Sequence, residues 1–240
     1  HQVELYDEEL QCEPYKKIGI KTLKPFRINK DIKKALKKMS DVNEEILNKK
    51  LFPITFGGEH SITPGCIAPF VKKHKKIYLL HFDAHADLRE SYNGEKFSHA
   101  SAIKRCLDHK NVSVISFGIR NISKNEISFL KKNSSRIKIF WAKDKLKWNL
   151  KKFQKLIKNK TVYLTFDVDG LDSSIMPATG TPEPGGLLWD ETLNIIKIAA
   201  KNSNIVGADI NELSPIKGFN SYNFLVAKLA YKILSYKFFY

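Results

Sequence analysis

An α/β fold with a mostly parallel central sheet and helices on both faces of that sheet is predicted by two observations on this sequence. Short apolar segments alternate along the chain with amphipathic segments at the spacing of β-α-β units. Several of the apolar segments end in aspartate, glutamate or histidine. The carboxyl ends of parallel strands lie along one edge of a sheet, where ligands bind, so this topology would bring the polar side chains together.

The composition favours one domain over residues 1–240. The chain is 42% hydrophobic and 28% charged, and it has no apolar run near the roughly 18 residues that a membrane span needs. Its three cysteines, Cys12, Cys66 and Cys106, are far apart and form no C-x-x-C pair, which argues against a disulfide framework and a structural zinc site. We therefore expect a soluble cytoplasmic protein with no membrane partner.

The net charge of +16 and the pI near 9.6 raise the question of nucleic acid. Most of the excess is lysine, spread in short clusters along the whole chain and mostly on the polar faces of predicted helices. A solvated surface explains this dispersed pattern more simply, so we expect no nucleic-acid partner. The alternative, a basic binding module without catalysis, would show steeply salt-dependent binding to nucleic acid.

The first half of the chain begins with residues 1–22, which show no periodicity and are expected to be irregular. Apolar residues at three- and four-residue steps predict a helix over residues 31–49, and a strand is predicted at residues 51–56. Ser61 is expected to cap a helix over residues 62–73. The elements expected next are strands at 77–82, 112–119 and 137–141 and helices at 100–107, 126–132 and 150–158.

The second half continues the alternation with a buried strand at residues 161–166. The following segment, 171–186, is rich in proline and glycine and long for a loop in a compact domain, which is typical of a functional loop. We then expect a helix with Asp190 as its N-cap, running to Lys201, a strand at 205–210 and a C-terminal helix at 222–236.

The run I-Y-L-L-H-F-D-A-H-A-D-L-R, residues 77–89, carries the first sign of chemistry. Asp83, His85 and Asp87 occupy alternate positions after a buried strand, and their side chains would share one face if the chain stayed extended. Burying two carboxylates together is unfavourable unless a cation lies between them. A metal ion would satisfy this requirement, whereas the same string in a solvated turn would need none.

Other predicted strand ends add donors of the same kind. His60 follows the strand at 51–56, Asp167 and Asp169 follow the strand at 161–166, and Glu212 follows the strand at 205–210. Taken singly, His60 could sit in a turn, Asp169 could stabilise the turn at Gly170, and Glu212 could be a surface acid. Together, imidazoles and carboxylates in this number suit two ions about 3.5–4 Å apart. An oxygen-rich set without thiolate favours a hard metal such as Mn²⁺.

The motifs resemble the signature blocks of the ureohydrolase superfamily of arginases and agmatinases, in the same order and over nearly the whole chain. The blocks are G-G-E-H-S at 57–61, F-D-A-H-A-D at 82–87, S-H-A-S at 98–101, F-D-V-D-G-L-D at 166–172 and T-G-T-P-E-P-G-G at 179–186. The resemblance implies a three-layer α/β/α arginase-like fold with two Mn²⁺ ions. It implies that one ion is held by His60, Asp83, Asp87 and Asp167, and the other by His85, Asp83, Asp167 and Asp169.

The T-P-E-P-G-G block is most similar to agmatinases, so the resemblance implies hydrolysis of agmatine to urea and putrescine, a step of polyamine biosynthesis. Departures from the pattern are Glu59 in place of Asp, Ser173 in place of Pro, and a variant block at residues 211–215; none removes a ligand. Relatives begin with a further strand and a P-G-A-R-type segment that this sequence lacks. The family also implies a homo-oligomer, either a trimer or a hexamer.

The resemblance also implies roles in catalysis. Two Mn²⁺ ions would lower the pKa of a shared water and supply hydroxide to attack the guanidinium carbon. Glu212 would pair with the guanidinium, Asp87 would carry a proton to the departing amine, and His99 would be a proton shuttle or substrate contact. His99 could instead be a capping or packing histidine.

Other activities stay open from the sequence. Guanidinobutyrate or arginine could replace agmatine, because the metal ligands are shared and the loops that would contact the rest of the substrate carry no motif. An amide hydrolase of the deacetylase type is a further alternative, which would use one zinc ion and fewer ligands.

Overall fold

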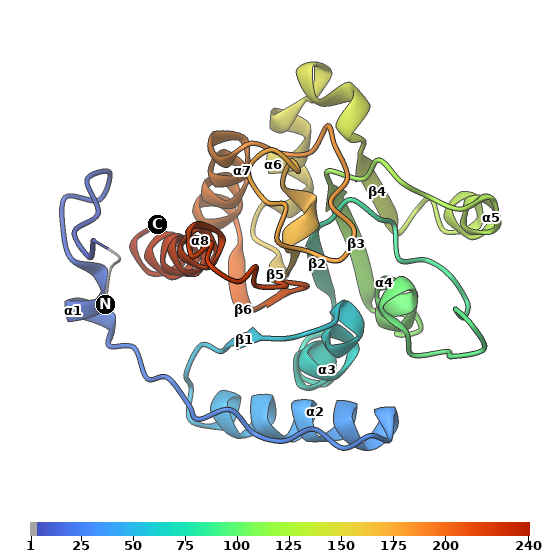
Figure 1. Cartoon of the computed structure of the whole chain (residues 1–240), viewed down its shortest axis with the longest axis horizontal. Coiled ribbons are helices and arrows are strands. Elements are labelled where there is room, and N and C mark those ends of the chain that lie inside the picture. Colours follow the sequence, from blue (N-terminus) through green and yellow to red (C-terminus); the bar gives the residue numbers. More distant parts are fainter. Residues whose placement is uncertain (1–3) are drawn as a thin grey trace.

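The computed structural model describes residues 4–240, which form a sheet of six parallel strands between two layers of helices (Figure 1). The strand order across the sheet is β1-β6-β5-β2-β3-β4. The strands are β1 (Ile54–Phe56), β2 (Ile77–Phe82), β3 (Val112–Phe117), β4 (Ile137–Phe140), β5 (Thr161–Asp167) and β6 (Asn204–Asn211). The predicted α/β fold with a parallel sheet is therefore confirmed.

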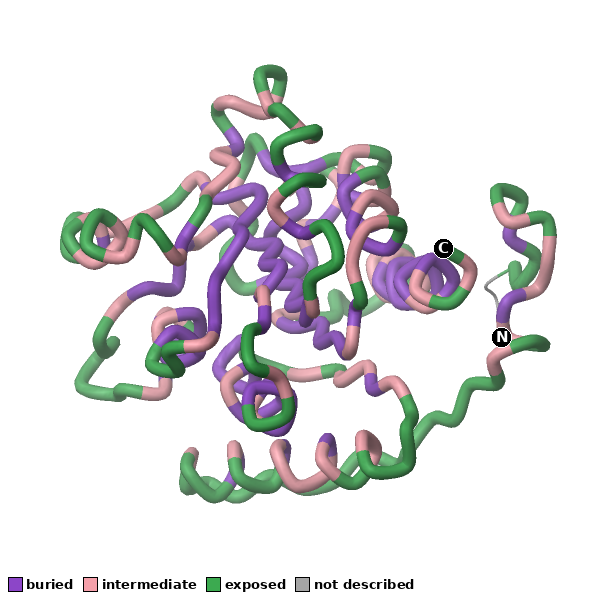
Figure 2. Tube along the Cα trace, turned by 180° about the vertical axis from the view of Figure 1, so that it is seen from behind, coloured by how far each residue is buried: buried purple, intermediate pink, exposed green. Residues whose placement is uncertain are grey.

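Helices cover both faces of the sheet and divide the core into two apolar layers. One layer packs against α2 (Ile32–Asn48), α3 (Thr63–Lys73), α4 (Ala102–Leu107) and α5 (Lys124–Lys132). The other packs against α6 (Leu150–Ile157), α7 (Trp189–Asn202) and α8 (Ser221–Phe239). Strand residues alternate between the layers, as on β2, where Leu79 joins the first and Leu80 the second. The buried residues gather in the sheet and on the helix faces toward it (Figure 2).

Three strands are shorter than the sequence predicts, and one of them, β4, ends a single residue early at Phe140. β1 begins at Ile54 because Pro53 has no N–H to donate, although its carbonyl still accepts a hydrogen bond from Ala208 N at 3.1 Å. β3 ends at Phe117 instead of residue 119, because Gly118 adopts a φ of 93° that leaves the extended conformation.

Two predicted helix caps are wrong. Ser61 lies inside a 3₁₀ helix, η1 (His60–Ile62), and α3 starts after it at Thr63 with a proline in its first turn. The helix α7 begins at Trp189, so Asp190 is already helical. The N-cap residue of α7 is Leu188, and its backbone N–H donates to Glu191 Oε2 at 2.9 Å. Further 3₁₀ helices are η2 (His99–Ser101), η3 (Ala142–Lys147) and η4 (Val168–Gly170).

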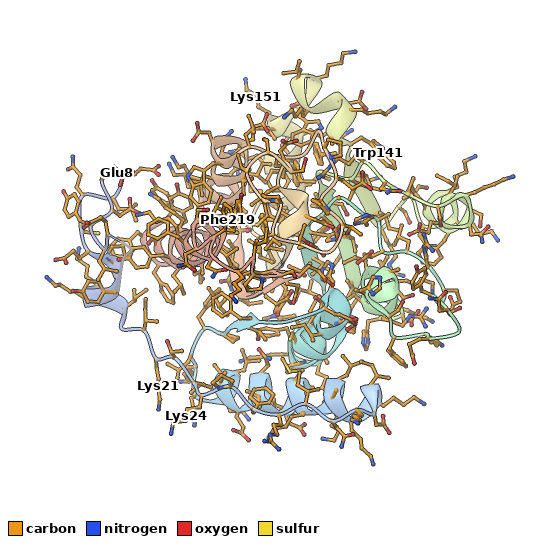
Figure 3. The ribbon with its side chains drawn as sticks, viewed as in Figure 1. Glu8, Lys21, Lys24, Trp141, Lys151 and Phe219 are labelled. Atoms are coloured by element: carbon orange, nitrogen blue, oxygen red, sulfur yellow. The ribbon has the colours of Figure 1, made fainter. Side chains whose placement is uncertain are left out.

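The N-terminal segment is less irregular than expected. Residues 1–3 lie outside the described residues, and the segment from residue 4 contains a short helix, α1 (Pro14–Ile18). Lys232 of α8 holds the segment through an ion pair with Asp7, with Nζ 2.8 Å from Oδ2. The chain then runs, largely exposed, to α2, and the side chains of Lys21 and Lys24 lie at the periphery (Figure 3). Among residues 4–240, no helix has both the length and the apolar character to cross a membrane.

Candidate metal centre

The candidate site lies where four parallel strands end at the same level of the sheet. Phe82 of β2 stands opposite Phe166 of β5, Phe166 stands opposite Ile210 of β6, and Ile210 stands opposite Phe56 of β1. The residues that follow these phenylalanines and Ile210 therefore emerge side by side. This register explains why polar residues that are far apart in the sequence meet at one edge.

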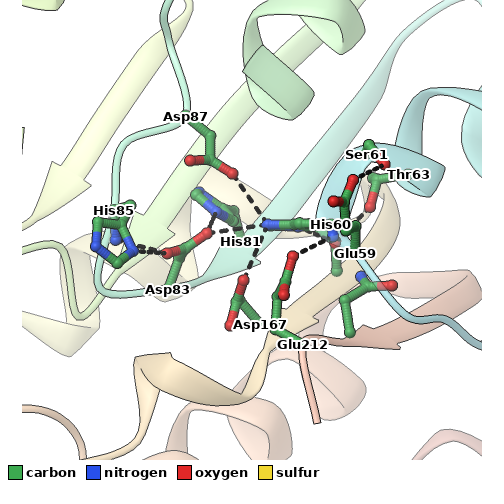
Figure 4. Close-up of polar contacts among 12 residues, drawn as sticks. Glu59, His60, Ser61, Thr63, His81, Asp83, His85, Asp87, Asp167 and Glu212 are labelled. Carbon is green, nitrogen blue, oxygen red and sulfur yellow. Dashed lines mark hydrogen bonds and ion pairs between the residues drawn. The ribbon is translucent and has the colours of Figure 1, made fainter. Parts of the chain in front are cut away.

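His60 is the centre of the first donor set (Figure 4). Its Nδ1 lies 3.0 Å from Asp83 Oδ2, 3.1 Å from Asp87 Oδ2 and 3.5 Å from Asp167 Oδ2. This buried nitrogen makes no hydrogen bond of acceptable geometry. Donors around a single ion with bonds of about 2.1 Å lie about 3 Å apart, so the distances from His60 Nδ1 to these carboxylates match the spacing of neighbouring donors in a divalent metal site.

A second donor set adjoins the first and shares Asp83 with it. His85 Nδ1 lies 3.0 Å from Asp169 Oδ2 and 3.5 Å from Asp83 Oδ1. One oxygen of Asp83 thus faces His60 and the other faces His85. The carboxylates of Asp83 and Asp169 are almost fully buried, whereas His85 is partly exposed. The structure therefore brings together all six residues predicted as metal ligands, namely His60, Asp83, His85, Asp87, Asp167 and Asp169.

The chain reaches this geometry by a route that the alternation argument did not predict. β2 ends at Phe82, and Asp87 adopts a φ of 51°, so the segment does not stay extended from Asp83 to Asp87. The turn directs the Asp87 carboxylate back toward His60. Gly170 allows the β5 turn to approach the β2 turn closely, because a Cβ at this position would lie 2.7 Å from Asp83 N.

The electrostatics of the cluster call for a cation. Burial and the charge of Asp83 raise the pKa of Asp87 to about 7, and burial together with Asp169 and Asp83 raises the pKa of Asp167 well above its usual value. Burial lowers the pKa of His85, but Asp169 and Asp83 outweigh it and raise that pKa to about 11. Without a metal, these groups would be neutralised by protons. A divalent ion supplies the missing positive charge and releases those protons.

His81 is a buried neighbour of the site that the sequence analysis treated only as the end of an apolar run. Its Nε2 lies 2.8 Å from Asp83 Oδ2, and its Nδ1 lies 3.0 Å from Ser116 Oγ. The signal was present in the sequence, since His81 precedes Asp83 by two residues and shares its face of β2. His81 holds the shared carboxylate, and His60, His81 and Asp83 also form a group that could bind an ion.

A second buried chain of hydrogen bonds, also not predicted, orients His60. His60 Nε2 lies 2.8 Å from Thr165 Oγ1, and Thr165 donates to Asp209 Oδ1 at 2.6 Å. Thr63 Oγ1 and Asn211 Nδ2 donate to the same oxygen. Because Nε2 is held by Thr165, Nδ1 faces the carboxylates. Hydrogen-bond partners of the other ring nitrogen commonly orient metal-binding histidines in this way.

Glu212 and His99 lie at the rim of the site and not among the metal donors. Glu212 Oε1 accepts a hydrogen bond from His60 N at 2.7 Å, and burial raises the pKa of Glu212. His99 is exposed in η2, and its ring centroid lies 5.5 Å from that of Tyr92. The charge of His99 opposes the rise in the pKa of Glu212, so the two side chains lie near each other.

In the comparison with known proteins, the arginase family matches residues 1–235 of this chain. The chain belongs to the arginase family. An N(1)-aminopropylagmatine ureohydrolase from Synechocystis sp. is 33% identical over 98% of this chain and 78% of that protein. An agmatinase from Bacillus anthracis is 38% identical over 73% of this chain, and the match spans 61% of that agmatinase.

A solved structure, the agmatine ureohydrolase of Thermoplasma volcanium, superposes with a TM-score of 0.88 at 29% identity over 100% of this chain and 80% of that one. The predicted arginase-like fold is confirmed, and the chain is an enzyme of the ureohydrolase type. Arginase-family enzymes are metal-dependent, and the described residues offer candidate donor groups for such a metal.

Proposed function

We propose that this enzyme hydrolyses the guanidinium group of agmatine to urea and putrescine, using two Mn²⁺ ions. The observation that carries the proposal is the shared position of Asp83 between two donor sets, with the carboxylate of Glu212 at the rim beside them. The agmatinases among its relatives support the choice of substrate.

His60, Asp83, Asp87 and Asp167 would hold one ion, and His85, Asp83, Asp167 and Asp169 the other. Carboxylate and imidazole donors without thiolate suit a hard divalent metal such as Mn²⁺. Bound there, the two ions would lower the pKa of a shared water so that hydroxide is available near neutral pH.

The residues at the rim would bind the substrate and move the proton. Glu212 would accept paired hydrogen bonds from the planar guanidinium and turn its carbon toward the cluster. Asp87 would accept a proton from the attacking water and pass it to the departing amine. His99, which is exposed and lies near Glu212, would contact the substrate or shuttle that proton to solvent.

A second candidate substrate is N(1)-aminopropylagmatine, because the Synechocystis ureohydrolase named for it matches nearly the whole chain. The two substrates share the reacting guanidinium and differ in the length and charge of the tail. Guanidinobutyrate and arginine would share the same ligands and are further alternatives.

The decisive experiment measures urea release by the manganese-loaded protein from agmatine, N(1)-aminopropylagmatine, arginine and guanidinobutyrate. We expect the highest kcat/KM with agmatine, and no urea from any substrate after Asp83→Ala or Asp167→Ala, because either change removes a shared ligand. Substantial urea formation by either purified variant would refute the assignment of the metal centre. Preference for another substrate would replace agmatine and leave the centre intact.

The assembly and location of the enzyme also stay proposals. The family resemblance favours a trimer or hexamer, which light scattering on the purified protein would measure. Cys12, Cys66 and Cys106 are free thiols, as expected in a reducing compartment such as the cytoplasm.

A further inference from the structure

Arg120 makes an unusual set of hydrogen bonds beside the metal centre. It follows β3, and its half-buried guanidinium donates only to backbone carbonyls. The acceptors are Gly118 O (3.0 Å), Asp169 O (2.7 Å), Leu171 O (3.2 Å), Glu183 O (2.6 Å) and Pro184 O (3.0 Å). Burial lowers the pKa of Arg120, but the nearby charges of Asp169, Asp172, Asp83 and Glu183 oppose this effect.

The backbone of Arg120 is tied to the other ligand-bearing segment. Its N–H donates to Ala84 O at 2.8 Å, and the N–H of Asn121 donates to the same oxygen at 2.9 Å. Ala84 lies between the ligands Asp83 and His85. Arg120 thus joins the β2 turn through its main chain to the β5 turn through its side chain.

The loop over residues 179–186 is the third segment that Arg120 joins, and this loop also contacts Asp169. Thr181 Oγ1 donates to Asp169 Oδ2 at 3.1 Å, and Asn121 Nδ2 donates to Glu183 Oε1 at 2.8 Å. The guanidinium of Arg120 donates hydrogen bonds to Glu183 O and Pro184 O of this loop. Arg120 and this loop therefore hold Asp169 at its carbonyl oxygen and at Oδ2, while Ala84 N donates to Oδ1 at 3.0 Å and Asp169 N donates to Asp167 Oδ1 at 3.0 Å.

Only arginine can make this arrangement. Its planar group directs several N–H donors outward in a fixed fork, whereas the lysine ammonium is a single point with three donors. A lysine here could reach one or two of the carbonyls and would leave the others to water. The proline-rich loop has no regular structure of its own to replace these bonds.

We propose that Arg120 is a positioning residue for the second metal ion, setting Asp169 opposite His85. The role rests on the proposed metal centre but not on the identity of the substrate. It goes beyond the ligand set, because the Arg120 side chain donates to backbone carbonyls and not to the side-chain atoms of the metal donors. Its effect should fall on the ion between His85 and Asp169, while the ion beside His60 is retained.

The test measures manganese binding to the metal-stripped protein by isothermal titration calorimetry, with Arg120→Lys and Arg120→Met against the wild type. We expect two sites in the wild type. In both variants we expect the affinity of one site for manganese to be unchanged and that of the other to fall about 10- to 100-fold. This is the usual effect of losing a hydrogen-bond partner that orients a metal ligand. Urea release should fall in parallel and recover at high manganese concentration.

Arg136 provides a matched control, because its guanidinium also donates to backbone carbonyls. These carbonyls lie near the amino end of β3, whereas Arg120 follows its carboxyl end. Arg136 donates to Val112 O at 2.9 Å, Leu107 O at 2.8 Å and His109 O at 2.6 Å. Arg136→Met should lower thermal stability and leave both manganese sites intact. If Arg136→Met weakens manganese binding as much as Arg120→Met, the effect is general loosening of the fold and the proposal is wrong.

Thr181→Val tests the same idea if the Arg120 variants fold poorly. Thr181 is exposed on the loop, so the fold should tolerate the change, and Thr181→Ser keeps the hydroxyl. We expect Thr181→Val to weaken the same site and Thr181→Ser to restore it. Equal loss of both sites, no change in either, or fewer than two sites in the wild type would overturn the proposal. Two sites without urea release would instead refute the substrate alone.

Discussion

Asp87 and Glu212 share an uncommon backbone conformation. Their φ values are 51° and 64°, in the left-handed region that costs a non-glycine residue about 1–2 kcal/mol. The bonds around Glu212 compensate, since its N–H donates to Gly58 O at 2.7 Å and its carboxylate accepts from His60 N. Strained residues cluster at functional sites because the surrounding structure must hold them there. Among residues 4–240, two of the six non-glycine residues with positive φ are those to which we assign proton transfer and guanidinium binding.

Replacing Glu212 with glutamine should separate substrate binding from metal binding. The amide oxygen can still accept from His60 N, so the fold and the manganese content should not change. A charge-assisted hydrogen bond is worth about 1.5–3 kcal/mol, so we expect kcat/KM for urea release to fall about 10- to 150-fold. Glu59→Gln is the control, because Glu59 is exposed and its carboxylate accepts from Ser61 Oγ. Similar losses in the two variants would contradict the assigned role of Glu212.

At the scale of single residues, the sequence was sufficient for the donors that carry a motif and insufficient for the side chains behind them. His60 and Asp169 were identified because polar residues at strand ends are conspicuous after apolar runs. Thr165 and Asp209 lie inside strands, where one polar residue looks the same whether it faces a helix layer or a metal ligand. Only the alignment of β5 with β6 places these two residues opposite each other and close to His60.

Among the elements, the loop after β5 is fixed by an acid that binds no metal. Asp172 Oδ1 accepts from Ser174 N, and Oδ2 accepts from Gly185 N at 2.7 Å and Gly186 N at 2.8 Å. Bonds from the Ser174 side chain, opposed by burial and assisted by these backbone N–H groups, hold the pKa of Asp172 at about 2. Ionised Asp172 thus ties the start of the loop to its end.

This depressed pKa predicts a pH-dependent contribution to stability. A carboxyl whose pKa is lower in the folded chain than its ordinary value of 3.8 stabilises the fold above about pH 4, and this stabilisation is lost as the pH falls toward 2. Asp172→Asn should therefore be less stable than wild type at pH 5, with a difference that shrinks as the pH is lowered. Urea-induced unfolding of both metal-free proteins, from pH 5 downward, measures this difference in the free energy of unfolding. A difference independent of pH would show that Asp172 is not held ionised.

The elements were predicted well in kind and less well at their ends. Apolar runs and three- to four-residue periodicity identified each of the six strands and the helices from α2 to α8, because burial determines both patterns. Helix starts depend on which backbone N–H groups find acceptors. Leu188 is capped by Glu191, a residue later in the helix, so the polar Asp190 was a misleading signal.

Across the whole molecule, an ion pair joins the two ends of the chain. The side chains of Asp7 and Lys232 are almost fully buried, and Tyr236 of α8 donates to Glu9 at 2.6 Å. A buried charge whose partner is removed is strongly unfavourable. The N-terminal segment is therefore part of the folded core around α8 and not a free arm.

Asp7→Asn should destabilise the protein by about 3 kcal/mol, because it removes the nearest and most buried counterion of the Lys232 ammonium and leaves the Glu9 carboxylate at 3.8 Å. Glu8→Gln is the matched control: its carboxylate lies 3.9 Å from the same ammonium, but its side chain is 78% exposed. We expect that control to change the free energy of unfolding by less than about 0.5 kcal/mol. Denaturant unfolding measures both variants, and manganese binding should be unaffected in each. A stable Asp7→Asn protein would mean that the segment does not anchor α8.

The whole-molecule features that sequence could not supply are those that join distant segments. Strand alternation predicts a parallel sheet but does not determine the order β1-β6-β5-β2-β3-β4. The acidic residues near the N-terminus and the lysines of the C-terminal helix can be read from the sequence, yet nothing in either segment indicates that they pair. The expected trimer or hexamer stays a prediction.

The shared level at which β1, β2, β5 and β6 end has a consequence for how such an enzyme can change over evolutionary time. Hydrogen-bonded strand ends hold the residues that would bind the metals, whereas η2 and the segment after Glu212 lie outside the strands. Mutations can alter the surrounding loops without disturbing the strands, so new substrates become accessible while the hydrolytic chemistry is kept. The names of its relatives, which include agmatinases, an aminopropylagmatine ureohydrolase and a guanidino acid hydrolase, are consistent with diversification of this kind.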